Sequence, residues 1–204
     1  MANSGYVVAN VVQCAPAYQA EALERIGRIA ELLKKDAGAF ITRLGVITTG
    51  EHTGGIVLFS MYEEMNGFAR GVEVASASAD FQAVGASGQA KLVFRNVIKI
   101  EDIGLAAPSA EAPSYTVLTR WGSDDLMLDR MGPMVRHFEE NGAMSLRFGT
   151  ILTGNAAGRR LLGVGYPSMD AIEKTYAALS ADPAYGAFVS DVEIDFRNIV
   201  RNVG

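Results

Sequence analysis

The sequence predicts an α+β fold built from two similar halves, each with the element order β-α-β-β-α-β. The segment at residues 38–50 recurs at residues 142–154, an offset of 104 residues, and both copies place an arginine two positions before a glycine. The alignment extends without a gap to residues 65 and 169 and matches 11 of 28 positions. Short β-branched runs and helix-periodic stretches also follow one another in the same order in both halves.

Further along the chain, the two halves align at a different offset. Ser78-Ala-Asp80 matches Ser180-Ala-Asp182, and Phe94-Arg-Asn96 matches Phe196-Arg-Asn198, both at an offset of 102 residues. This alignment places a two-residue deletion ahead of Ser180. Identities scattered over loops and strands of divergent copies predict an internal duplication.

The elements of the first half follow from local pattern. The run at residues 6–13 is short and β-branched, which favours a buried strand that Pro16 ends. Apolar residues spaced by three and four predict an amphipathic helix at 21–35, with Gly38 placed to cap it. Two apolar runs joined by a glycine-rich loop predict a hairpin, followed by a helix that Gly67 and Gly71 weaken. These later elements are strands 40–48 and 56–62, helix 63–78 and strand 91–100.

A segment with prolines and no apolar period separates the halves and predicts a linker. We expect a first repeat at 1–101, a linker at 102–114 and a second repeat at 115–204. The same patterns then predict strand 115–121, helix 126–141, hairpin strands 142–152 and 160–166, helix 168–181 and strand 192–200.

A four-stranded antiparallel sheet with both helices on one face leaves its other face bare, and a second sheet would bury it. Each half therefore predicts a ferredoxin-like repeat. This order, with the segments 169–176 and 180–185, resembles the dimeric α+β barrel superfamily, which includes antibiotic-biosynthesis-monooxygenase-like, EthD-like and NIPSNAP-like domains. The resemblance implies one barrel of about eight strands whose interior often holds a small apolar ligand. No catalytic motif of these families is matched.

Composition excludes several classes of function. A net charge of −5 removes the general attraction to nucleic acid, and no apolar run approaches the ~18 residues of a membrane span. The lack of a signal-peptide pattern and the single cysteine predict a cytoplasmic protein. The two histidines, His52 and His137, have no acidic or thiol cluster at ligand spacing, so we expect no metal and no cofactor. They also argue against haem degradation.

Arg43 and Arg147 are the main candidate ligand-binding residues. Strand alternation places Arg43 on the face of Gly45, away from Leu44, and the second copy repeats this pattern. Both arginines are expected to face the barrel interior, with the glycine leaving room beside each guanidinium. Such a pair suits an anion or carbonyl site. Alternatively, each arginine makes an ion pair or carbonyl contact that fixes the register of the two sheets.

Five further residues are candidate ligand contacts. Asn96 and Asn198 lie among apolar neighbours, either to orient a substrate or to tie a loop or helix end to the sheet. Tyr62, Tyr166 and Trp121 end strands and either line a pocket or simply pack in the core.

The leading hypothesis is a small-molecule-binding tandem barrel. It would act as a cofactor-independent monooxygenase or isomerase on a small aromatic or carboxylate compound. The alternative is a non-catalytic assembly or ligand-sensing module with a solid barrel. The sequence decides neither whether the protein is an enzyme nor whether it forms a homodimer.

Overall fold

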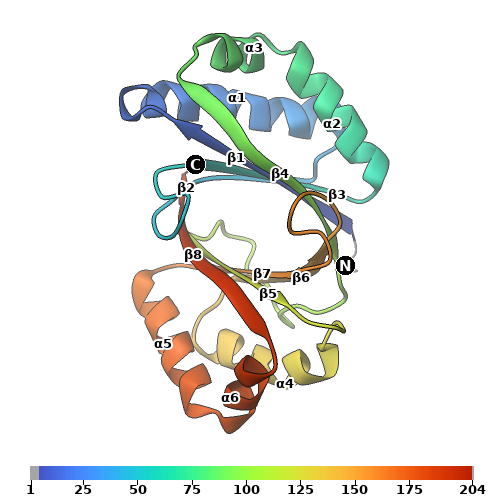
Figure 1. Cartoon of the computed structure of the whole chain (residues 1–204), viewed down its shortest axis with the longest axis vertical. Coiled ribbons are helices and arrows are strands. Elements are labelled where there is room, and N and C mark those ends of the chain that lie inside the picture. The colour runs from blue at the N-terminus through green and yellow to red at the C-terminus, as the bar shows by residue number, and fades with distance from the viewer. Residues whose placement is uncertain (1–4, 204) are drawn as a thin grey trace.

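The computed structural model describes residues 5–203 and shows a closed, eight-stranded antiparallel barrel with helices packed outside it (Figure 1). The helices α1 to α3 cover one side of the barrel and α4 to α6 cover the opposite side. No helix in this part of the chain has the length and apolar character that crossing a membrane requires. The strands are β1 (Gly5–Cys14), β2 (Ile41–Ile47), β3 (Ile56–Tyr62), β4 (Ala90–Ile100), β5 (Tyr115–Gly122), β6 (Ser145–Ile151), β7 (Arg160–Tyr166) and β8 (Glu193–Val203). The helices are α1 (Gln19–Ala37), α2 (Met65–Ala77), α3 (Ala79–Ala86), α4 (Leu128–Glu140), α5 (Met169–Ala181) and α6 (Pro183–Ser190), and a 3-10 turn (Pro16–Tyr18) precedes α1.

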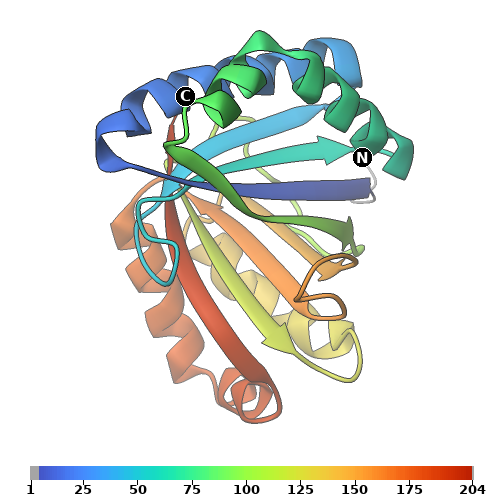
Figure 2. The ribbon, with the colours of Figure 1, turned by 45° about the horizontal axis from the view of Figure 1, so that its top comes forward.

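The barrel consists of two four-stranded sheets that join at both edges. Around the ring the order is β1-β3-β2-β8-β5-β7-β6-β4. Each repeat therefore contributes a ferredoxin-like sheet, β4-β1-β3-β2 or β8-β5-β7-β6. The pairs β2–β8 and β4–β6 close the ring, and Figure 2 shows the two sheets facing each other. The predicted fold is confirmed: two tandem ferredoxin-like repeats form one intramolecular α+β barrel.

Strand alternation divides the apolar side chains into three cores. One core packs α1 and α2 against the outer face of the first sheet, and another packs α4 to α6 against the second sheet. The third core fills the barrel interior, where both sheets contribute side chains such as Phe59, Ile98 and Val200. Each sheet is therefore apolar on both faces.

Each repeat contains a short helix that the pattern analysis did not predict. Ser78 caps α3 by accepting from the Phe81 amide, and Asp182 caps α6 by accepting from the Ala184 amide. The helices α3 and α6 keep the offset of 104 residues, since Ala79 corresponds to Pro183. The predicted deletion ahead of Ser180 is therefore wrong, and the two-residue difference lies after α6, before the end of β8.

The glycines of α2 have a packing role. A Cβ at Gly67 would lie 2.5 Å from the Tyr62 ring, and a Cβ at Gly71 would overlap the Tyr62 hydroxyl. Both glycines are buried and allow the helix backbone to rest on this tyrosine. The glycines that weaken α2 by propensity thus bring it close to the sheet.

The glycine of the repeated Arg-x-Gly segment lies at the seam between the two sheets. A Cβ at Gly149 would lie 2.6 Å from Ile98 Cγ2 and closer still to the Lys99 carbonyl oxygen. A Cβ at Gly45 would overlap Val200 and lie 2.9 Å from a backbone oxygen of β8. These glycines therefore make room for the neighbouring strand, and the prediction that they make room for the guanidinium is wrong.

We predict that Gly149→Ala lowers the free energy of unfolding by about 1–3 kcal/mol, because the added methyl meets backbone that cannot move without opening the seam. Chemical denaturation measures the change. Gly85→Ala is the matched control, since Gly85 lies in α3 and a methyl group there would have no atom within 4 Å, so alanine should be neutral or stabilising. Equal stability of Gly149→Ala and the unchanged protein would contradict the role of the seam glycine.

Candidate functional site

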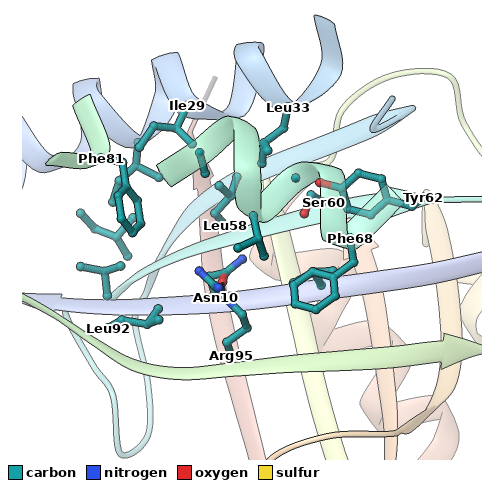
Figure 3. A pocket seen from close by; sticks show the side chains of 17 residues that line it. Asn10, Ile29, Leu33, Leu58, Ser60, Tyr62, Phe68, Phe81, Leu92 and Arg95 are labelled. Atoms are coloured by element: carbon teal, nitrogen blue, oxygen red, sulfur yellow. Dashed lines mark hydrogen bonds between the residues drawn. The ribbon is translucent and has the colours of Figure 1, made fainter. Parts of the chain in front are cut away.

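The first repeat has a pocket between its helices and the outer face of its sheet, which we call the helix-side pocket. Its volume is about 80 Å³, and its walls come from α1, α2, α3 and the strands β1, β3 and β4. Apolar side chains such as Ile29, Leu33 and Leu58 line most of it (Figure 3). Phe81 and Leu92 also line it and are 41% and 43% exposed, so they form an apolar rim that is open to solvent. A ligand larger than the enclosed volume would extend over this rim.

Arg95 is the charged group of the helix-side pocket. Its side chain leaves β4 towards Asn10 (Figure 3), and its Nε donates to Asn10 Oδ1 at 2.5 Å. Within residues 5–203, no carboxylate lies within ion-pair distance of Arg95. Burial lowers the pKa of the Arg95 guanidinium, which means that the cation is incompletely solvated there. Arg95 therefore presents a positive charge to an otherwise apolar space.

Two buried hydroxyl groups complete the polar part of the pocket. Ser60 is 1% exposed and Tyr62 is 2% exposed, and both line the pocket. Burial raises the pKa of the Tyr62 phenol, with Ser60 acting in the opposite direction, so the phenol stays protonated at neutral pH. Together with Arg95 and Asn10, these groups could recognise one polar or anionic group on a ligand.

The second repeat fills the equivalent space with aromatic side chains. Arg197 corresponds to Arg95, but its guanidinium lies 4.5 Å from the centroid of the Tyr176 ring. Arg197 also donates to Thr119 Oγ1 at 3.2 Å and to the Tyr185 hydroxyl at 2.9 Å. The cavity that remains there is only about 30 Å³. The second repeat therefore shows what this arginine does when no ligand space is left.

Three substitutions between the repeats account for the difference in volume. Position 72 of α2 is valine where α5 has Tyr176, and position 81 of α3 is phenylalanine where α6 has Tyr185. By strand register, Val12 of β1 corresponds to Trp121 of β5, because each pairs with the first residue of its partner strand. The helix-side pocket is thus a consequence of sequence differences at aligned positions.

Of the seven predicted site residues, Tyr62 alone lines the helix-side pocket. Tyr166 and Trp121 are buried in the helix-covered core of the second repeat, where Trp121 stacks on Phe148 at 5.4 Å. None of the three lines a cavity with Arg43 and Arg147, because the two tyrosines and the tryptophan lie on the outer faces of the sheets. The structure therefore does not bring the predicted arginines and aromatic walls together.

Arg43 and Arg147 face the barrel interior, as predicted, and line one cavity of about 130 Å³. We call it the arginine cavity. Arg43 Nη1 donates to the Thr42 carbonyl oxygen at 3.2 Å, and Arg147 Nη1 donates to the Leu146 carbonyl oxygen at 2.9 Å. Both bonds stay within the arginine's own strand, so they do not fix the register between sheets.

Asn96 and Asn198 lie at the opposite end of the barrel, beside a cavity of about 510 Å³ that we call the hairpin cavity. With its amide oriented so that both ends find partners, Asn96 donates to the Thr153 carbonyl oxygen at 3.1 Å. Asn198 packs directly against Gly50 in the equivalent hairpin loop. These contacts correspond to the loop-tying role. Contact with a ligand stays a prediction.

Sequence reasoning did not select Arg95 and Asn10, although both carry a signal. Asn10 interrupts a β-branched strand, and its face is the helix-covered one because Val8 and Val12 share it. Arg95 is directly cross-strand from Asn10. The pairing of β1 with β4, which the sequence pattern does not specify, is what brings the two together.

We predict opposite effects of the same substitution at the two equivalent arginines. Arg95→Met should leave the free energy of unfolding unchanged or raise it, because a partly buried cation without a carboxylate partner costs stability. Arg197→Met should lower it by about 1–3 kcal/mol, because two hydrogen bonds and an aromatic stack are lost. Urea denaturation of both variants tests this; an equal loss at both positions would show that Arg95 is a structural residue.

Solved structures with the same fold cover nearly the whole chain. An anthrone oxidase-like protein matches with a TM-score of 0.66 at 16% identity, covering 98% of this chain and 92% of that one. A chlorite dismutase variant from Candidatus Nitrospira defluvii matches with a TM-score of 0.67 at 6% identity, covering 100% and 92%. A candidate monooxygenase from Lactobacillus acidophilus NCFM matches with a TM-score of 0.61 at 11% identity, covering 98% and 93%. Identities this low show a shared fold.

A comparison with curated proteins finds no match. A family model does match, over residues 4–100 and 113–202, and these ranges include all of the strands except the last residue of β8. The chain belongs to the family described as domain of unknown function DUF6854.

Proposed function

We propose that the helix-side pocket binds a small aromatic compound that carries an anionic oxygen, and that the protein oxidises it with O₂ without a cofactor. The observation that supports this is Arg95. It is a partly buried cation without a carboxylate partner in the described chain, and it borders a space that the second repeat fills with Tyr176. A phenolate or enolate would supply the missing negative charge, and its ring would occupy the apolar space.

The pocket favours the anion of such a compound. Arg95 offers donors in a rigid fork, while the surrounding side chains exclude water and so strengthen the charge interaction. Tyr62, whose phenol burial keeps protonated, is a further donor. Stabilising the anion raises the fraction of ligand that is ionised, and an electron-rich carbanion or phenolate is the form that reacts with O₂ directly.

The absence of a base favours oxidation over isomerisation. Asn10, Ser60, Tyr62 and Arg95 are the polar residues that line the helix-side pocket, and none is a carboxylate or a histidine. An isomerase that moves a proton between two carbons needs a positioned base. An oxygenase whose substrate enters already ionised does not.

The reaction balances without another reductant. A ring CH₂ beside the ionised group becomes C=O, O₂ supplies the carbonyl oxygen, and the second oxygen atom leaves as water with the two hydrogens. The fold that this chain shares with an anthrone oxidase-like protein and a candidate monooxygenase supports this class of chemistry.

Haem, which the fold relatives named chlorite dismutase and haem-binding protein suggest, does not fit the helix-side pocket. The pocket encloses about 80 Å³, and no histidine, cysteine or methionine lines it. Of the two histidines, His137 Nε2 lies 2.7 Å from Asp182 Oδ2, and His52 packs its ring against Phe94 in a hairpin loop. The arrangement therefore favours chemistry on the organic substrate alone.

Ligand sensing without turnover is the second candidate function, and the same pocket would serve it. A solid barrel is not supported, since the interior contains cavities of about 130 and 510 Å³. Binding with no O₂ consumption would favour sensing over catalysis.

We predict that a hydroxylated polycyclic aromatic such as an anthrone raises the melting temperature of the protein, because it binds the folded state only. Oxygen uptake measured with an electrode, in the presence of a metal chelator and without flavin, tests turnover. Val72→Tyr should weaken binding about tenfold or more, because it supplies the ring that covers Arg197 in the second repeat.

The matched control is Ala181→Tyr, at the end of α5 and on the far side of the barrel from the pocket. It should leave ligand binding unchanged. If Val72→Tyr binds the aromatic as tightly as the unchanged protein does, the ligand does not occupy the helix-side pocket and the proposal is wrong.

A further inference from the structure

We propose that the arginine cavity is a second ligand site, distinct from the helix-side pocket, which binds a small dicarboxylate across Arg43 and Arg147. The two arginines come from β2 and β6, which are four strands apart in a ring of eight and therefore lie on opposite walls. Both line the same cavity at the same end of the barrel. Their guanidinium groups thus approach one space from opposite directions.

Each guanidinium has donors to spare. The single hydrogen bond of each runs from Nη1 to the preceding carbonyl of its own strand. Neither has a carboxylate within ion-pair distance in the part of the chain that the structure describes. Burial lowers the pKa of Arg147, which shows that its charge is partly removed from water. Two positive charges therefore share one cavity without internal compensation.

The cavity exists because the second repeat lacks side chains that the first repeat has. Gly163 and Gly165 of β7 line the cavity at the positions where β3 has Phe59 and Met61. A Cβ at Gly163 would meet nothing closer than 3.5 Å, so this glycine leaves space inside the barrel. At Gly165, by contrast, a Cβ would lie 2.7 Å from Pro113 of the linker.

The linker between the repeats covers this end of the barrel. Pro108, Ser109, Glu111 and Pro113 line the cavity, and the Ser109 amide donates to the Met144 carbonyl oxygen at 2.8 Å. Glu111 is the acidic side chain among the lining residues, and it is exposed and outside ion-pair distance of both arginines. The cavity is therefore roofed by a segment whose one charge would repel an anion only weakly.

The walls decide which anion fits. Ile98, Ile100, Leu118 and Leu161 lie between the arginines, so the middle of the cavity is apolar. A dicarboxylate with a short hydrocarbon body places one carboxylate at each guanidinium and its methylene or ring carbons against these walls. Inorganic phosphate has the charge but no apolar body, and a monocarboxylate leaves one arginine without a partner.

Isothermal titration calorimetry tests this proposal with succinate, glutarate, adipate and isophthalate, against butyrate and inorganic phosphate. One of the dicarboxylates should bind at least about tenfold more tightly than butyrate, because a second charge-assisted pair forms. Arg43→Gln and Arg147→Gln should each lower that affinity about tenfold or more. Gly163→Val, which fills the space and keeps both charges, should lower it as well.

Two further variants make the result specific. Glu111→Gln should raise dicarboxylate affinity about twofold, because it removes the negative charge at the rim. Arg95→Met changes the helix-side pocket and should leave dicarboxylate binding unchanged, so failure of one site is distinguishable from failure of the other. Phosphate or butyrate binding as tightly as every dicarboxylate would overturn the proposal, and so would dicarboxylate binding that survives both arginine substitutions.

Discussion

The close approach of the two sheets at their seams is the constraint on which the rest of the barrel depends. Gly45 and Gly149 have no side chain where β8 and β4 cross, and a methyl group at either would meet backbone oxygen atoms. Next to each seam, a threonine hydroxyl of the hairpin accepts from the backbone of the partner repeat: Thr49 Oγ1 from the Ile199 amide at 2.8 Å, and Thr153 Oγ1 from the Val97 amide at 3.0 Å. Each repeat thus closes the edge of the other, which removes the exposed strand edges that a single sheet would leave. The repeated Arg-x-Gly segment is therefore first a structural element of the seam.

Because the seams hold both repeats in equivalent positions, each side chain can be compared with its counterpart in the same molecule. Arg197 shows the arginine as a structural residue, stacked on Tyr176 and bonded to Thr119. Arg95 has the same place in the fold, but Val72 stands where the stacking ring would be. Partly buried cations cost free energy unless they have partners. The chain therefore carries a cost in one repeat that its other repeat avoids, and a ligand anion is the physical reason that would account for it.

The sequence was sufficient for the fold because the fold depends on local patterns that occur twice. The periodicity of α1, the two hairpins and the repeated arginine and asparagine positions predicted both sheets, and alternation placed Arg43 and Arg147 on the interior face. The helices α3 and α6 were missed because each is only 8 residues long, although their capping residues, Ser78 and Asp182, are visible in the sequence. The helix-side pocket was missed for a different reason. It depends on β1 pairing with β4, and on a comparison of aligned positions in α2 and α5 that requires the correct offset.

The same comparison explains why the two proposed sites lie on opposite faces of the sheets. On the helix-covered face, the first repeat has the smaller side chains, so its arginine borders open space. In the interior, the second repeat has the smaller side chains, since Gly163 and Gly165 replace Phe59 and Met61. Deleting bulk from a packed core leaves a cavity that destabilises the protein. Each repeat has therefore lost bulk beside an arginine that lacks a carboxylate partner, once on each face, while its counterpart keeps the space filled. Loss of packing without regard to function would leave cavities at positions unrelated to charge, whereas both of these adjoin a guanidinium with free donors.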